Sequence, residues 1–267
     1  MRVRIDKLLV ERGLAPSRER AQRLVLAGVV YASGQRVTKA GSFVDADAPI
    51  EVRGEDLPYV SRGGLKLAAA LDSFGIDVRG RTCLDVGAST GGFSDCLLQR
   101  GATHVYAIDV GYGQLAWKLR HDPRVTVFER TNFRFFAPER LPELANFAAV
   151  DVSFISLRLV LPNVLRCVDA GSDVVLLVKP QFEVGREHVG SGGVVRDPEL
   201  HRQAVETIKE AALALGFTVV GECPSPLLGP KGNREFFLHA RVPPVHSPPE
   251  ESTNRERSPI EAPRPKR

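Results

Sequence analysis

The sequence is poor in cysteine and has no long apolar run. Its four cysteines, Cys83, Cys96, Cys167 and Cys223, stand far apart without metal-ligand spacing, so we expect reduced core thiols and no metal site. No segment approaches the roughly 20 apolar residues that span a bilayer, and no apolar core follows the basic residues at the N-terminus. These absences predict a cytoplasmic protein without a membrane partner.

Two phosphate-binding motifs are missing as well. The chain lacks a Gly-Lys-Ser/Thr loop, and residues 84–95 break the dinucleotide pattern Gly-x-Gly-x-x-Gly because their glycines are Gly87, Gly91 and Gly92. These residues instead join an apolar strand to a helix through a glycine-rich turn, which a ligand can approach closely. Asp85 would repel a pyrophosphate, whereas a positively charged sulfonium tolerates a nearby acid. The turn therefore favours S-adenosylmethionine over a dinucleotide, and a purely structural turn is the alternative.

A second acidic residue strengthens the case for an adenosine cofactor. Asp109 ends the next apolar run, which begins at Val105. A carboxylate at this point of an α/β unit typically accepts hydrogen bonds from ribose hydroxyls. We therefore expect the adenosine end of the cofactor to lie beside Asp109.

Positive charge is concentrated near the N-terminus. Residues 1–44 contain nine Lys or Arg and three acids, a net charge of +6, whereas the whole chain carries +4. A cluster of this kind is often only a solvated face. Its position in a small module with its own pattern instead favours a nucleic-acid partner.

The first 57 residues are predicted to form an α+β module. Apolar spacing indicates one helix over 5–13, and Ser17 is typical of the N-cap of a second helix that ends at Gly28. Short strands are predicted around the turn Ser33-Gly34, and another covers residues 49–52.

This module resembles the S4 RNA-binding domain. The resemblance rests on Arg4-Ile-Asp-Lys-Leu-Leu, Ser17-Arg-Glu-Arg-Ala and Gly28-Val-Val-Tyr-Ala-Ser-Gly. It implies that the second helix and the hairpin present basic residues to RNA phosphates, contacts that give affinity rather than sequence specificity. A helix-hairpin module for protein contacts is the alternative. The matching positions are Arg4, Lys7, Ser17, Arg18, Arg20, Arg23 and Lys39.

The remainder is predicted to be a doubly wound α/β domain, Rossmann-like, with a seven-stranded sheet. The expected strands lie near 82–86, 103–109, 124–129, 147–151, 173–178, 217–222 and 235–241, with helices over 65–74 and 198–215. We assign residues 58–64 to a linker, 65–242 to this domain, and 243–267 to a disordered tail, because seven of the last 25 residues are proline.

Four charged residues are expected to converge at one edge of this sheet. Asp151 and Lys179 each follow a buried strand, Glu235 begins the last strand, and Lys66 begins the helix before the first strand. A lysine at the mouth of a buried strand is costly unless it is paired or used. For each residue alone, a surface ion pair is the alternative.

The set resembles the Lys-Asp-Lys-Glu tetrad of FtsJ-like ribose 2′-O-methyltransferases. Together with the S4-like module, residues 1–242 resemble the TlyA family of rRNA cytidine 2′-O-methyltransferases, through Ser61-Arg-Gly-Gly-x-Lys, Asp151-Val-Ser-Phe-Ile-Ser and Val178-Lys-Pro-Gln-Phe-Glu. The resemblance implies that Lys66, Asp151, Lys179 and Glu235 are catalytic. It also implies rRNA of the 50S and possibly the 30S subunit as the partner. A neutral Lys179 would accept the hydroxyl proton and a charged one would stabilise the alkoxide, and both roles stay open.

The turn and the resemblance together predict the cofactor contacts. Asn132 stands where relatives hold the adenine, although the family pattern usually has aspartate there. Arg62 and Arg134 are expected to guide the RNA backbone, with plain surface charge as the alternative. Residues 185–196 are either a mobile substrate loop or an ordinary connection. The predicted cofactor residues are Asp85, Gly87, Ala88, Ser89, Thr90, Gly91, Gly92, Phe93, Asp109, Asn132 and Asp151.

Three other functions remain as alternatives. The family's haemolysin names suggest a membrane-active cytolysin, but the sequence offers no spanning segment. Pseudouridine synthases also carry S4 modules, yet they have no use for the cofactor turn. A non-catalytic ribosome-assembly RNA binder would not need the four tetrad residues. The sequence does not indicate an oligomeric state.

Overall fold

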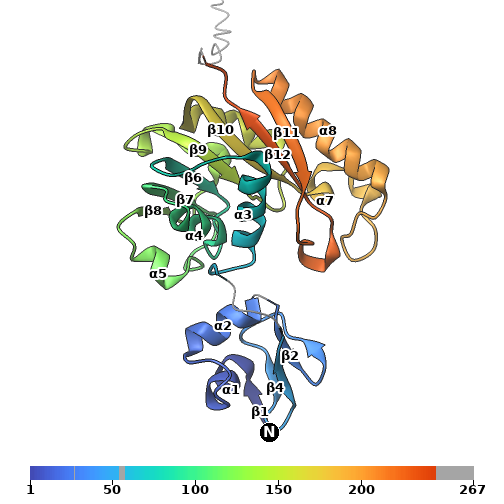
Figure 1. Ribbon diagram of the computed structural model, residues 1–267. Coiled ribbons are helices and arrows are strands. Elements are labelled where there is room, and N and C mark those ends of the chain that lie inside the picture. Colours follow the sequence, from blue (N-terminus) through green and yellow to red (C-terminus); the bar gives the residue numbers. More distant parts are fainter. Residues whose placement is uncertain (27, 54–57, 245–267) are drawn as a thin grey trace, which may run out of the picture.

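The computed structural model describes residues 1–26, 28–53 and 58–244, which form two units (Figure 1). In the smaller N-terminal unit, one sheet has the strand order β3-β2-β5 and a separate pair joins β1 to β4. Its elements are β1 (Arg2–Arg4), α1 (Ile5–Glu11), α2 (Arg18–Leu26), β2 (Val30–Ala32), β3 (Gln35–Arg36), β4 (Phe43–Asp45) and β5 (Ile50–Val52).

The N-terminal unit folds around the apolar faces of its two helices. Ile5, Leu9 and Val25 are buried in one cluster that also covers the small sheet. The hydroxyl of Ser17 accepts a hydrogen bond from the backbone N–H of Arg20 at 3.1 Å, so the predicted N-cap is confirmed. The pairing of β1 with β4 is absent from the sequence prediction.

The larger unit is built on a seven-stranded sheet with the order β11-β12-β10-β9-β6-β7-β8, which confirms the predicted α/β class. Neighbours from β10 to β8 are parallel, and β12 is antiparallel to β10 and β11. The predicted strands agree with the observed ones to within two residues at each end, except that β10 begins at Val168 rather than at Asp173. The strands are β6 (Thr82–Val86), β7 (His104–Ile108), β8 (Val125–Phe128), β9 (Ala145–Val150), β10 (Val168–Val178), β11 (Thr218–Pro224) and β12 (Phe236–Arg241).

Helices cover both faces of this sheet. They are α3 (Gly63–Phe74), α4 (Gly92–Gln99), α5 (Trp117–Arg120), α6 (Leu161–Cys167), α7 (Pro180–Glu183) and α8 (Pro198–Ala214). Short 3₁₀ turns are η1 (Phe133–Phe135), η2 (Pro138–Arg140), η3 (Leu157–Leu159), η4 (Arg186–His188) and η5 (Pro230–Gly232).

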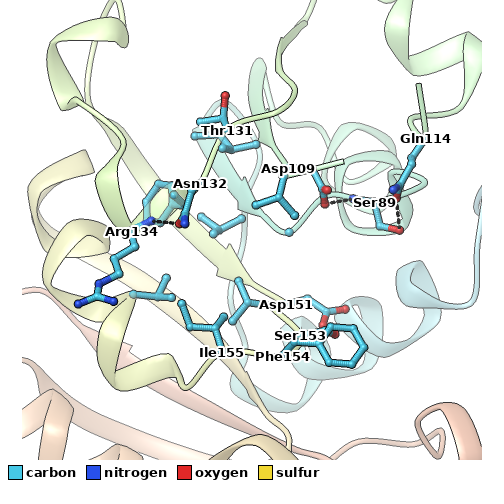
Figure 2. A pocket seen from close by; sticks show the side chains of 17 residues that line it. Ser89, Asp109, Gln114, Thr131, Asn132, Arg134, Asp151, Ser153, Phe154 and Ile155 are labelled. Atoms are coloured by element: carbon cyan, nitrogen blue, oxygen red, sulfur yellow. Dashed lines mark hydrogen bonds between the residues drawn. The ribbon is translucent and has the colours of Figure 1, made fainter. Parts of the chain in front are cut away.

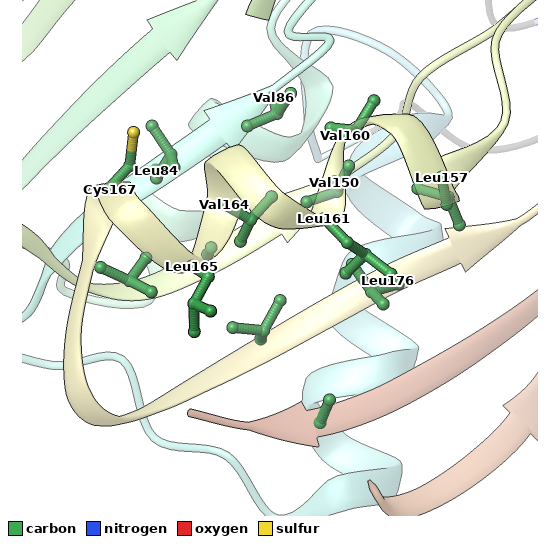
Figure 3. Close-up of a cluster of buried hydrophobic side chains, with 14 of the residues drawn as sticks. Leu84, Val86, Val150, Leu157, Val160, Leu161, Val164, Leu165, Cys167 and Leu176 are labelled. Carbon is green, nitrogen blue, oxygen red and sulfur yellow. The ribbon is translucent and has the colours of Figure 1, made fainter. Parts of the chain in front are cut away.

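Alternation along each strand divides the interior into two cores. On one face Leu84 and Val86 pack with α6 and α8, and Figure 3 shows part of this cluster. On the other face Cys83 packs with α3 and α4. Since both faces are buried, the polar residues that follow the strands gather at the edge of the sheet.

Several local features differ from the sequence prediction or go beyond it. Helix α3 begins at Gly63 rather than at Leu65, and the short helices α5, α6 and α7 are additional. Of the predicted tail, residues 245–267 lie outside the described residues. Among the helices that the structure describes, none has the length and apolar character that a membrane crossing requires.

Candidate active site

The glycine-rich turn lies where the order of the sheet reverses. The chain runs from β6 outwards to β7 and β8 and then returns to β9 on the other side of β6. Gly87, directly after β6, has φ +86°, and a Cβ there would lie 2.2 Å from the carbonyl oxygen of Asp151. Only glycine therefore lets the two strand ends approach so closely. Ligands of open α/β sheets bind at such a reversal point.

A cavity of about 320 Å³ opens beyond the ends of β6, β7 and β9. Figure 2 shows Asp109 and Asn132 on one side of this first cavity, and on the other side Asp151, Ser153, Phe154 and Ile155. The Asp109 carboxylate accepts hydrogen bonds from the backbone N–H groups of Ser89 at 2.8 Å and Gly111 at 2.6 Å. Asp109 thus ties the glycine-rich turn to the segment after β7. The side-chain oxygen of Asn132 accepts from the Arg134 backbone N–H at 3.1 Å.

A second cavity, of about 290 Å³, lies on the other side of the turn. Both cavities are lined by Gly87, Ser89 and Asp151, so Asp151 stands where they meet. The structure brings together all four predicted catalytic residues, since Lys66, Asp151, Lys179 and Glu235 line this second cavity. Ala88, Thr90, Gly92 and Phe93 of the predicted cofactor set line it too.

The four charged residues form two ion pairs. Lys66 pairs with Glu235, and Lys179 pairs with Asp151. Lys179 also donates a hydrogen bond to the Ser153 hydroxyl at 2.9 Å. Both lysines are 8% exposed, and Glu235 is 1% exposed. Because an unpaired buried charge is costly, each carboxylate compensates the lysine it contacts and fixes the direction of its amine.

Two predicted cofactor residues lie away from both cavities. Asp85 is fully buried, and one of its oxygens accepts hydrogen bonds from the backbone N–H of Ser94 at 2.9 Å and the Ser94 hydroxyl at 2.6 Å. It therefore holds the start of α4. Gly91 packs instead against α5 and the segment before it, where a Cβ would lie 2.2 Å from Leu119 and 2.8 Å from Leu115. The predicted direct contacts of Asp85 and Gly91 with a cofactor are corrected accordingly.

The burial of Asp85 predicts a pH dependence of stability. Desolvation raises the pKa of Asp85 to about 7, whereas an unfolded aspartate titrates near 4. Between these values the folded state holds a proton that the unfolded state has lost, so this group lowers the free energy of unfolding as pH rises from about 4 to about 7. In urea unfolding between pH 5 and 8, we expect Asp85→Asn to gain stability relative to the unmutated chain as pH rises. Parallel pH profiles would contradict this assignment.

Sequence reasoning missed Glu183, which joins the segment after β9 to the one after β10. Its carboxylate accepts hydrogen bonds from the Ser156 hydroxyl at 2.5 Å and from the Leu157 backbone N–H at 2.9 Å. The rings of Phe154 and Phe182 lie 5.2 Å apart across the same junction. Glu183 thereby supports the wall of the first cavity. The only signal for it in the sequence was that it is the acidic residue at the end of the motif Val178-Lys-Pro-Gln-Phe-Glu.

Glu183→Ala is expected to lower the free energy of unfolding by about 1–3 kcal/mol, because Leu157 and Ser156 lose their half-buried acceptor. Urea denaturation measures the change. Glu187→Ala is the matched control: its carboxylate is exposed, and we expect a change within about 0.5 kcal/mol. Equal losses in the two variants would refute the role given to Glu183.

The predicted RNA-binding residues of the N-terminal unit fall into distinct environments. Arg4 and Arg18 both contact the buried carboxylate of Asp6. The others are exposed Lys7 and Lys39, half-buried Arg20 and Arg23, and Ser17, which caps α2.

The two predicted RNA-binding residues of the larger unit lie at different cavities. Arg62 lines the second cavity. Arg134 lines the first cavity, and its guanidinium lies 5.2 Å from the ring centre of the exposed Phe135. The two cavities therefore each have an arginine at their border.

Hydrogen bonds hold the C-terminal part of the segment 185–196 in place. The buried side chain of Asn233 accepts a hydrogen bond from the Val195 backbone N–H at 3.0 Å and donates one to the Gly193 carbonyl at 2.8 Å. His201 contacts the Val195 carbonyl at 2.9 Å. These bonds favour an anchored connection over a fully mobile substrate loop. Figure 1 shows this segment beside the turn before β12.

Comparison with known proteins agrees with this architecture. A family model for FtsJ-like methyltransferases matches residues 59–242, and one for the S4 domain matches residues 3–50. The 16S/23S rRNA (cytidine-2′-O)-methyltransferase TlyA of Mycobacterium tuberculosis is 51% identical over 90% of each chain. Hemolysin A of Brachyspira hyodysenteriae is 41% identical over 89% of this chain and 99% of its own.

A solved structure, described as a candidate haemolysin from Streptococcus thermophilus, superimposes with a TM-score of 0.73. It is 46% identical and covers 91% of this chain and 89% of its own. Sequence and fold therefore agree over both units. The chain belongs to the TlyA family, in which an S4 domain precedes an FtsJ-like methyltransferase domain.

Proposed function

We propose that this protein transfers the methyl group of S-adenosylmethionine to the ribose 2′-hydroxyl of a cytidine in rRNA. The convergence of Lys66, Asp151, Lys179 and Glu235 in one cavity carries the proposal. That cavity adjoins a second one at the reversal point of the sheet. The name of the Mycobacterium tuberculosis relative supports the same substrate.

The residues of the first cavity fit the cofactor. Gly87 leaves the backbone open to close approach, and the Asp109 carboxylate at the end of β7 suits ribose hydroxyls. Asn132 and Asp151 would frame the adenine and the methionine ends. The volume lies in the range of small-molecule sites. When bound, S-adenosylmethionine supplies an electrophilic methyl group on a cationic sulfur.

The tetrad would activate and position the hydroxyl. A ribose hydroxyl is a weak nucleophile, so its proton must be taken or its developing negative charge stabilised as the oxygen–carbon bond forms and the carbon–sulfur bond breaks. Lys179 serves here as proton acceptor when neutral or as alkoxide stabiliser when charged. Asp151 and Ser153 hold the Lys179 amine in place, and Glu235 holds that of Lys66. Fixed geometry of this kind supplies much of the rate enhancement of a transfer reaction.

The N-terminal unit would recruit the RNA. Its basic side chains suit phosphates, whose contacts position a nucleic acid without reading its sequence. In-line transfer then depends on how the target ribose enters the second cavity, where Arg62 lies beside the tetrad.

Methyl transfer onto purified ribosomal subunits tests the proposal. The chain is incubated with tritiated S-adenosylmethionine and either 30S or 50S subunits, and the labelled RNA is digested to nucleosides. We expect label in 2′-O-methylcytidine. A labelled base, or no label in either subunit although the chain binds S-adenosylmethionine, would overturn the proposal. Mapping of the labelled ribose then identifies the target nucleotide.

A further inference from the structure

A buried carboxylate organises two arginines on the N-terminal unit. Asp6, in the first turn of α1, is fully buried. Its Oδ1 accepts from Arg4 Nε at 3.0 Å, and its Oδ2 accepts from Arg4 Nη2 at 2.8 Å. The same Oδ2 accepts from Arg18 Nε and Gln22 Nε2, each at 3.0 Å. One acid thus ties the start of α1 to two turns of α2.

The arginines keep donors for a partner outside the chain. Arg4 uses Nε and Nη2 on Asp6, and Arg18 uses only Nε. Among the contacts of residues 1–26, 28–53 and 58–244, neither Nη1 of Arg4 nor the two terminal nitrogens of Arg18 have an acceptor. The two side chains are 39% and 55% exposed. Each guanidinium is therefore bound to Asp6 through some of its nitrogens, and its other nitrogens are accessible to a partner.

This arrangement lowers the cost of binding an anion. Hydrogen bonds from Arg4 hold the pKa of the Asp6 carboxyl well below its usual range, against the effect of burial, so the group stays charged. The Arg4 guanidinium also lies 3.6–3.8 Å from where a Cβ of Gly41 would stand. A flexible arginine loses rotamer entropy when it binds a phosphate, whereas an arginine already fixed loses less.

We propose that Asp6 is a positioning residue for RNA binding, which orients Arg4 and Arg18 towards backbone phosphates. The RNA partner rests on the proposed function above. Asp6 itself does not touch the RNA, because its carboxylate is fully buried. Its acidic charge opposes RNA, so it strengthens binding only through the geometry that it imposes.

The negative charge of Asp6 weakens RNA binding, whereas its orientation of the arginines strengthens it. A substitution at Asp6 can therefore distinguish the two effects. Asp6→Asn adds one unit of positive charge, so simple charge attraction predicts tighter binding and a steeper salt dependence. If Asp6 positions the two arginines, its substitution instead predicts weaker binding and a shallower salt dependence. We expect the Kd for an rRNA fragment and the KM for ribosomal subunits to rise about tenfold, with a shallower salt slope and kcat changed less than twofold.

Glu11→Gln is the matched control, since it adds the same charge on an exposed position of the same helix. We expect it to bind RNA as tightly as the unmutated chain or more tightly. A folded Asp6→Asn chain that binds like Glu11→Gln would overturn the positioning role. Absence of rRNA binding by the unmutated chain would instead count against the proposed function.

A second measurement needs no substitution and covers the case in which Asp6→Asn does not fold. In the free protein, nuclear magnetic resonance should show slower solvent exchange for the Nε–H groups of Arg4 and Arg18 than for that of Arg36. Arg36 uses a terminal nitrogen rather than Nε in its 3.4 Å contact with Tyr31. Equal exchange at all three would overturn the proposal.

Discussion

Lys179→Ala is expected to abolish methyl transfer while leaving the binding of S-adenosylmethionine and RNA nearly unchanged. The amine of Lys179 lies in the second cavity and is held by Asp151 and Ser153. Removing a group that takes the hydroxyl proton or stabilises the alkoxide costs about 10³-fold in rate. Single-turnover transfer of a tritiated methyl group measures the loss, and calorimetry follows cofactor affinity. Turnover within tenfold of the unmutated chain would contradict the assignment.

Two further substitutions separate the possible roles of Lys179. Lys179→Arg keeps the charge but does not release a proton near neutral pH, so retained activity indicates electrostatic stabilisation and lost activity indicates proton acceptance. Ser153→Ala removes one hydrogen bond from the amine and keeps the ion pair with Asp151. We expect it to slow transfer about tenfold. A wholly silent Ser153→Ala would show that the ion pair alone positions the amine.

The sequence was sufficient for the sheet and for the positions of Asp151 and Lys179 because both rest on local signals, whereas the grouping with Lys66 and Glu235 rested on the family resemblance. Apolar runs mark each strand, and a charged residue directly after a buried run, such as Asp151 or Lys179, falls at the edge of the sheet by topology alone. Asp85 was misjudged because it stands inside its strand rather than after it. Strand alternation puts it on the same face as Cys83, towards α4, where Ser94 binds it.

Contacts between segments that are distant in the chain could not be predicted from the sequence pattern. Glu183 and Leu157 are 26 residues apart, and Asn233 and Gly193 are 40 apart. Neither pair shares a helix face or a strand register that periodicity reveals. Asp6 belongs to the same class, since its arginine and glutamine partners on α2 come together only when the two helices pack. Residues that position functional groups were therefore harder to predict than the groups themselves.

Gly87→Ala is expected to destabilise the fold and to remove cofactor binding together. The residue has φ +86°, and a Cβ would stand 2.2 Å from the Asp151 carbonyl oxygen, which belongs to backbone and has little room to shift. Strain and displacement should cost about 3 kcal/mol in the free energy of unfolding. Moving Asp151 away from the turn by a few tenths of an ångström or more disturbs both cavities, so cofactor affinity should fall about 100-fold. Urea unfolding and calorimetry measure the two effects.

Gly80→Ala separates backbone strain from the close approach at Gly87. Gly80 has a similar φ of +72°, but a Cβ there would meet nothing within 4 Å, and the residue lines neither cavity. We expect a cost of about 1 kcal/mol in the free energy of unfolding and unchanged methyl transfer. If both alanines have the same effect on stability and cofactor affinity, the contact with Asp151 does not set the geometry of the site. A loss of stability and cofactor affinity at Gly87 but not at Gly80 would show that the close approach of the ends of β6 and β9 sets the geometry of the site. Backbone strain alone would affect both positions.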